Sequence, residues 1–116
     1  HVKCGIEIYM WLYVKPRRCR LVRPGSNWCT VGRTVECILE DMRSITFKII
    51  TPENKYYDEV VDISEIPFRE GKTTRVSVSV SFVDSDRCNI TIKDLGFGEF
   101  VKSSGKVISK ELVLRS

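Results

Sequence analysis

The feature that most constrains the fold is an eight-residue run, Arg75–Phe82, in which apolar and polar residues alternate. Valine or phenylalanine stands at every even position and serine at the odd positions between them, so one side of an extended chain is apolar and the other polar. This pattern predicts a half-buried antiparallel strand. The turn residues Asp84-Ser85-Asp86 follow, and residues 88–93 alternate again, which together predict a β-hairpin.

Short segments of the same kind recur along the chain, separated by turn residues. The predicted strands are Gly5–Val14, Cys19–Val22, Thr34–Leu39, Ile45–Thr51, Tyr56–Ile63 and Val107–Leu114. The predicted turns between them are Lys15-Pro16-Arg17, Arg23–Asn27 and Pro52–Lys55. No window of a dozen residues carries an apolar stripe at helical spacing between caps. About eight short strands with regular turns predict an all-β fold, a β-sandwich or a barrel.

Length and composition fit one globular domain over residues 1–116. The chain is 42% hydrophobic and 29% charged, and no segment approaches the ~20 apolar residues that cross a bilayer. Because the chain begins at His1 and not at Met, we expect it to be a fragment of a longer protein.

The charge is modest but unevenly placed. Lys and Arg number 19 against 15 Asp and Glu, a net charge of +4, and basic residues crowd positions 15–33 while acidic residues gather in 58–70. A solvated basic face is the main interpretation, and a nucleic-acid or membrane patch is the minority one. Trp28 near these arginines could stack on a base, but packing is the simpler interpretation.

The cysteines favour a reducing compartment, and we expect a cytoplasmic protein. Their number is odd, none is spaced as CxxC, and the only histidine is His1, so no metal site is expected. Most are interpreted as small buried hydrophobic residues, although disulfides in a secreted protein stay open. The five are Cys4, Cys19, Cys29, Cys37 and Cys88.

The sequence shows no complete catalytic motif. Gly71-Lys72-Thr73 resembles the end of a phosphate loop, but Ile66 stands where that motif needs a glycine. The carboxylate pairs Glu40-Asp41 and Asp58-Glu59 are interpreted as solvated. We therefore expect a binding or structural module without catalytic residues or a cofactor.

The first strand is apolar on both faces, whereas a sandwich strand needs only one apolar face. The simpler interpretation is a strand buried between two layers or covered by a missing part of the protein. The functional interpretation is a groove for an extended apolar ligand.

Several short motifs follow one another along the chain: Gly5-Ile6-Glu7, Leu21–Ser26, Glu40-Asp41 with Ile45–Ile49, Ile63–Pro67, and the hairpin Val76–Asp94. Their order resembles the substrate-binding β-domain of the DnaK-type, seventy-kilodalton heat-shock chaperones. The tail from Asp94 through Val107 is similar to the C-terminal end of uncharacterised, DnaK-like bacterial proteins. The resemblance implies an antiparallel β-sandwich of about eight strands that lies in the C-terminal part of a longer, chaperone-like protein.

The resemblance also implies a cleft that holds an extended apolar peptide or an unfolded protein segment. The residues carried over to that cleft are Ile6 and Ile8 along it, Tyr9 and Ile38 at the two arch positions, Ile45, Phe47 and Val76 in the pocket, and main-chain groups near Ile8 and Glu36. An upstream ATPase-like domain would be the other partner and would bind any ATP.

Departures from the family leave a second hypothesis open. Tyr9 and Phe47 are bulkier than is usual at their positions and would fill the pocket, and Lys15-Pro16-Arg17-Arg18 replaces a glycine-rich turn. The alternative is a degenerate sandwich that serves as a protein-interaction or regulatory platform within a DnaK-like parent protein. An open groove beside Ile6, Ile38 and Ile45 would favour the cleft, and a filled one would favour the platform.

Overall fold

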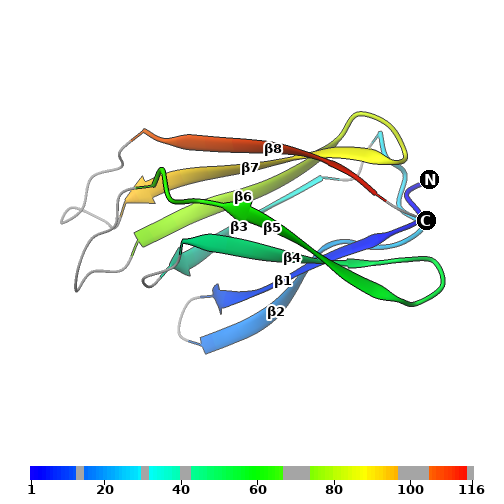
Figure 1. Cartoon of the computed structure of the whole chain (residues 1–116), viewed down its shortest axis with the longest axis horizontal. Coiled ribbons are helices and arrows are strands. Elements are labelled where there is room, and N and C mark those ends of the chain that lie inside the picture. Colours follow the sequence, from blue (N-terminus) through cyan, green and yellow to red (C-terminus); the bar gives the residue numbers. More distant parts are fainter. Residues whose placement is uncertain (13–14, 30–31, 40–42, 67–73, 97–104, 115–116) are drawn as a thin grey trace.

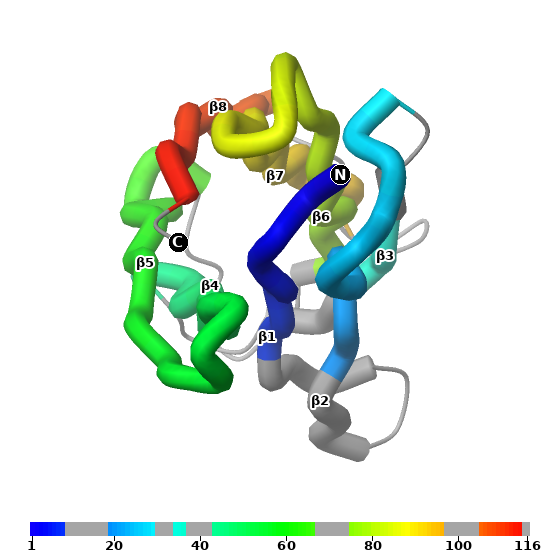
Figure 2. The backbone as a smooth tube through the Cα atoms, turned by 90° about the vertical axis from the view of Figure 1, so that its right-hand side faces the viewer, coloured from blue at the N-terminus to red at the C-terminus, as the bar shows by residue number. Residues whose placement is uncertain are grey.

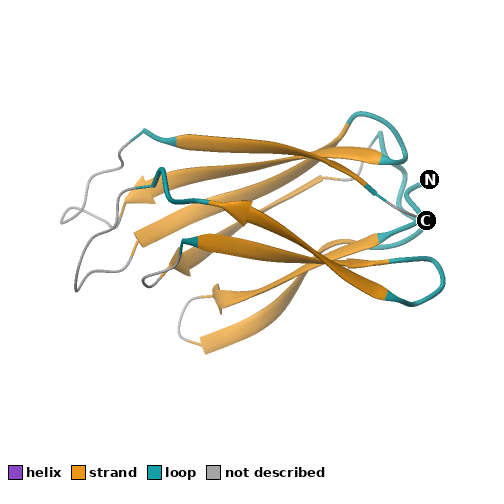
Figure 3. Cartoon of the chain, viewed as in Figure 1, coloured by secondary structure: helices purple, strands orange, loops and turns teal. Residues whose placement is uncertain are grey.

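A computed structural model describes residues 1–12, 15–29, 32–39, 43–66, 74–96 and 105–114 of the chain. Within these ranges it contains eight strands, β1 to β8, and no helix (Figure 3). Accordingly, no helix in the described part of the chain is long and apolar enough to cross a membrane.

Four strands form the first sheet in the order β5-β4-β1-β2, and each neighbouring pair is antiparallel. Their bounds are β1 (Gly5–Leu12), β2 (Lys15–Val22), β4 (Ser44–Ile50) and β5 (Tyr56–Asp62). The strands β1 and β4 are therefore central, and β2 and β5 are the two edges of this sheet.

The other four strands form the second sheet in the order β3-β6-β7-β8, again with antiparallel neighbours. Their bounds are β3 (Gly32–Leu39), β6 (Thr74–Phe82), β7 (Arg87–Gly96) and β8 (Val107–Val113). The predicted hairpin of alternating residues is the β6–β7 pair at the centre of this sheet.

The two sheets stack face to face as a β-sandwich, which confirms the predicted fold class (Figure 1). One backbone pair, Trp11 with Ile38, joins β1 to β3 and links the layers on one side. On that side lie the edges β2 and β3, and on the opposite side lie the edges β5 and β8 (Figure 2).

The core lies between the sheets and follows the period-two pattern. Burial alternates along β4 and β7, because every second side chain points inward. On β4 the inward side chains are Ile45, Phe47 and Ile49, and each has 0% of its surface exposed. Trp28 is partly buried and packs against this core, as the packing interpretation predicted.

Two local predictions are wrong. Lys15-Pro16-Arg17 is not a turn but the start of β2, where it pairs with the end of β1. An edge strand tolerates a proline because one side of its backbone needs no hydrogen-bond donor. The second hairpin strand runs on to Gly96 instead of ending at Lys93, across a register shift opposite Arg75.

Candidate functional site

Five of the eight residues expected to contact a peptide lie in the closed core. They come from β1, β4 and β6, and none has more than 1% of its surface exposed. They are Ile6, Ile8, Ile45, Phe47 and Val76. Side chains that pack against each other at this level of burial hold the sandwich together, and a ligand reaches them only if the sheets part.

The remaining three expected residues lie on β1 and β3. Glu36 is exposed on β3, where its Oε2 lies 3.7 Å from Nη1 of Arg75. Such an exposed ion pair contributes little to stability. The side chains of Tyr9 and Ile38 lie outside the described residues, but the Trp11–Ile38 backbone pair brings their two strands together.

Glu7 is a buried charged residue on the outer face of the first sheet, with 6% of its surface exposed. Its Oε1 accepts a hydrogen bond from Nε of Arg20 on β2 at 3.4 Å. Nearby, Nζ of Lys48 lies 4.1 Å from the centre of the Tyr56 ring, an arrangement that favours a cation–π contact. A pocket of about 280 Å³ lies among these four residues, Pro24, Ile50 and Asn54. In this pocket Arg20 already contacts Glu7 and Lys48 already contacts Tyr56, so the arrangement of these charged groups does not point to a ligand.

Four of the five large exposed apolar side chains in the described part of the chain lie on the edge strands β5 and β8. Tyr56 and Val60 of β5 are 57% and 52% exposed, and Val107 and Val113 of β8 are 50% and 61% exposed. Between these strands Nζ of Lys110 donates a hydrogen bond to the backbone carbonyl of Val60 at 3.0 Å. The side chain of Lys110 therefore spans from one sheet to the other and holds an edge carbonyl of β5.

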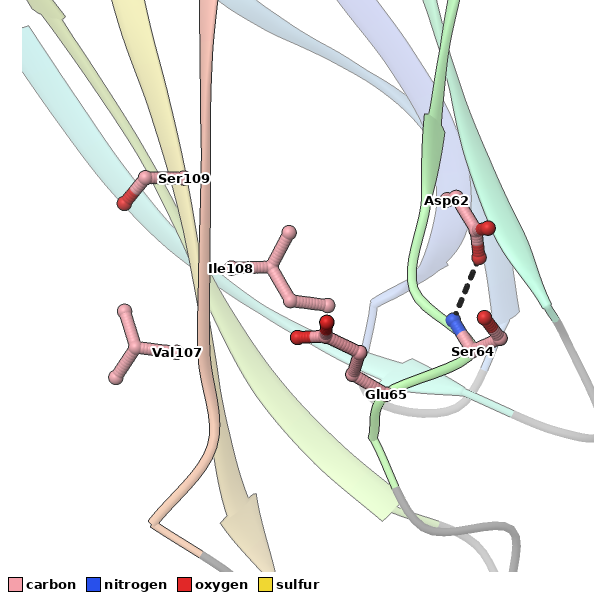
Figure 4. A pocket seen from close by; sticks show the side chains of 6 residues that line it. All are labelled: Asp62, Ser64, Glu65, Val107, Ile108 and Ser109. Carbon is pink, nitrogen blue, oxygen red and sulfur yellow. Dashed lines mark hydrogen bonds between the residues drawn. The ribbon is translucent and has the colours of Figure 1, made fainter.

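A pocket of about 420 Å³ lies between the end of β5 and the start of β8. Figure 4 shows its lining: Asp62, Ser64, Glu65, Val107, Ile108 and Ser109. The N–H of Ser64 donates to Oδ1 of Asp62 at 2.8 Å, and this bond lowers the pKa of the Asp62 carboxyl. Across the pocket Ile108 of β8 points toward Glu65, whereas the side chain of Val107 points away from it (Figure 4).

The backbone groups of alternate β5 residues point away from β4, toward the edge of the sheet. Ile63 donates its N–H to the carbonyl of Arg43, so the odd-numbered residues of this segment face the β4 side. The carbonyl of Val60 instead meets Lys110, which shows that the even-numbered residues face away from β4. Tyr56, Asp58 and Asp62 share this outward direction with Val60, because backbone groups alternate along a strand.

The sequence did not lead us to predict a candidate site at the edge strands β5 and β8. The signal available was the mixture of apolar and acidic residues in 56–62, Tyr-Tyr-Asp-Glu-Val-Val-Asp, which has no purely polar face. That pattern is typical of an edge strand with one side exposed, but strand order comes only from the tertiary structure.

The acidic turn Asp84-Ser85-Asp86 is structural. The carboxylate of Asp84 accepts hydrogen bonds from the N–H groups of Asp86 and Arg87, both at 2.9 Å. Its Oδ2 also lies 2.7 Å from Nη2 of Arg87. The backbone hydrogen bond from Asp86, followed by the bond from Arg87, lowers the pKa of the Asp84 carboxyl. In the described part of the chain no group of three or more His, Cys, Asp or Glu residues is placed to hold a metal ion.

Three of the cysteines are small core residues, as predicted, and are not in disulfides. Cys4, Cys19 and Cys88 are buried, whereas Cys29 is exposed in a turn. Burial, with a smaller effect of Glu111, raises the pKa of the Cys88 thiol to about 12. The side chain of Cys37 lies outside the described residues, as do the predicted motifs Glu40-Asp41 and Gly71-Lys72-Thr73.

Comparison with known proteins places the chain in a family. Residues 1–114 match the model of a family described as a domain of unknown function, DUF8552, and the chain belongs to that family. No curated protein and no solved structure matches the chain.

Proposed function

We propose that the chain is a protein-interaction module: a β-sandwich that docks an extended polypeptide segment on its surface and performs no chemistry. One observation carries this proposal. The side chains expected to line an internal cleft are packed in the core, while exposed apolar side chains lie on the edge strands β5 and β8 and the backbone groups of the even-numbered β5 residues point away from β4.

The partner is an extended segment that adds as a strand to β5. Backbone hydrogen bonds supply the affinity in strand addition, and pockets for alternate side chains supply the preference. The apolar Tyr56 and Val60 lie on the exposed face of β5, so a partner with an apolar residue at every second position would cover them.

A peptide cleft of the chaperone type is the second candidate. It is favoured by the Trp11–Ile38 pair, which brings together the two strands that carry the expected arch residues Tyr9 and Ile38. In this case the sheets would part beside Ile6 and Phe47 to admit the ligand.

The test is a titration of the isotope-labelled chain with an uncharged extended peptide that has two central leucines, followed by backbone amide shifts. Edge docking is expected to move the amides of 56–62 and of neighbouring β8. Cleft binding is expected to move those around Ile6, Ile8 and Phe47 instead. Peptide-dependent shifts in neither region at millimolar peptide would overturn both candidates.

A matched pair of variants sharpens the result. Val60→Pro removes an N–H that points away from β4, so it blocks the added strand and keeps the β4–β5 ladder. Val60→Thr keeps that N–H and a strand-forming side chain. Edge docking predicts that only the proline variant loses binding, and equal binding by both variants would contradict it.

A further inference from the structure

The first sheet has edges of opposite charge. The edge strand β2, Lys-Pro-Arg-Arg-Cys-Arg-Leu-Val, has four basic residues among eight and no acidic one. The edge strand β5, Tyr-Tyr-Asp-Glu-Val-Val-Asp, has three acidic residues among seven and no basic one. Two central strands, β4 and β1, separate the edges, so they cannot pair with each other within one molecule.

We infer that the occupant of the β5 edge is β2 of a second copy of this chain. The inference rests on the proposed function, because it names the strand that docks there. Opposite charges on these two edge strands steer them together and fix which edge pairs with which. Like edges, β2 with β2 or β5 with β5, would instead bring like charges together across the new strand pair.

Strand direction agrees with this pairing. Neighbours in the order β5-β4-β1-β2 are all antiparallel, so β5 and β2 of one molecule run in opposite directions. A second copy placed beside the first in the same orientation therefore pairs its β2 with β5 as an antiparallel ladder. The sheet continues without a change of strand direction.

A second copy placed in this way also brings the second sheets of the two copies side by side. The outer strands of this sheet, β3 and β8, lie on the same two sides as β2 and β5, and they also run antiparallel to each other (Figure 2). The end of β3 already pairs with β1 at Ile38, so only the rest of β3 is available to a second copy. This placement would bring β3 of one copy next to β8 of the next, where Val107 and Val113 are 50% and 61% exposed. Because different surfaces meet, the contact generates a ring or an open row of copies instead of a closed twofold dimer.

Lys110 moderates this contact. Its Nζ occupies the outward carbonyl of Val60, which an added strand would need. A lysine over a sheet edge is a common protection against edge-to-edge pairing. The incoming β2 must displace Lys110, so association is reversible, and removing the lysine side chain is expected to strengthen it.

The experiment is sedimentation velocity of the 116-residue chain over a range of concentrations, with two charge reversals. Asp58→Arg reverses an exposed position of β5, and Arg18→Glu reverses β2 at a position two residues before the exposed Arg20. Each variant alone should weaken association about tenfold or more, since like charges then meet at the contact. A one-to-one mixture of the two variants should associate again, because the basic β2 of one meets the acidic β5 of the other.

Two control variants test whether association depends on the charges at the contact or only on the net charge of the chain. Lys93→Glu on β7 changes the net charge as Arg18→Glu does, and Glu53→Arg in the β4–β5 turn changes it as Asp58→Arg does. Both controls should associate as the wild type does. Association of the wild type should weaken as salt rises above ~0.1 M, where the screening length falls below about 10 Å. Lys110→Ala should shift the equilibrium toward larger species.

Three outcomes would overturn the inference: a monomeric wild type at millimolar concentration and low salt, charge reversals that leave association unchanged, or folded variants whose mixture does not associate. Circular dichroism of each variant establishes folding before the comparison. The uncharged leucine peptide keeps the two proposals distinguishable. If it still binds the β5 edge of a monomeric protein, the self-association fails and the docking function stands.

Discussion

Replacing Phe47 by alanine tests whether this residue belongs to the core or to a ligand pocket. Phe47 is fully buried on the central strand β4, between its backbone partners Ile8 on β1 and Glu59 on β5. Its neighbours along the inward face, Ile45 and Ile49, are also fully buried, so little can move in to fill the space. We expect a loss of about 4 kcal/mol in the free energy of unfolding, within the ~3–5 kcal/mol typical of buried phenylalanine.

Urea denaturation followed by tryptophan fluorescence measures this loss. With a slope of about 2 kcal/mol per molar urea, the midpoint should fall by roughly 2 M. A domain of this size has ~5–15 kcal/mol of stability in total, so the variant should remain folded but marginal. Val60→Ala is the matched control on the neighbouring strand β5, and at 52% exposure it should cost less than about 0.5 kcal/mol.

The reasoning is refuted if Phe47→Ala loses less than about 1 kcal/mol and at the same time abolishes binding of the leucine peptide. That result would place Phe47 in an open pocket of the kind that the chaperone resemblance implies.

Three further predictions concern a turn, the thiols and a glycine. Since the pKa of Asp84 is lowered in the folded protein, its carboxylate stabilises the fold above the unfolded pKa of ~3.9, and the contribution is lost as pH falls through the folded value. Asp84→Asn should therefore be less stable than the wild type at pH 7, with a difference that shrinks below about pH 4 in pH-dependent denaturation; a constant difference down to pH 2 would contradict this. In native protein at pH 8, iodoacetamide should modify Cys29 and spare Cys88, whose thiol stays protonated because burial raises its pKa to about 12; peptide mass spectrometry reads this out, and equal rates would refute the burial of Cys88. Gly25 adopts a φ of +86° with nothing within 4 Å of an added Cβ, so Gly25→Ala should cost about 1 kcal/mol through backbone strain alone, and an unchanged denaturation midpoint would argue against that conformation.

The strands could be predicted because their signal is local. The apolar face of β6 was predicted from alternation alone, since a sheet with one buried face imposes period two on the sequence. The start of β2 could not be predicted, because Pro16 resembles a turn residue until it is known that its strand lies at an edge.

The candidate site was less predictable than the fold. The resemblance selected apolar residues such as Ile45 and Val76, and in an isolated sequence a core residue and a pocket residue look alike. Both are apolar and both lie at inward strand positions. Only burial separates them, and burial depends on what the opposite sheet places against them.

The sequence by itself determined the all-β class, most of the strand segments and which residues of most strands are apolar, because these follow from interactions between near neighbours along the chain. It also determined that a basic segment, 15–33, precedes an acidic one, 58–70. Only the tertiary structure decided that these segments contribute β2 and β5, opposite edges of one sheet, and that Lys110 contacts Val60, fifty residues away in the sequence. Strand order is set by long-range packing of two whole faces, and no local pattern in a single sequence specifies it.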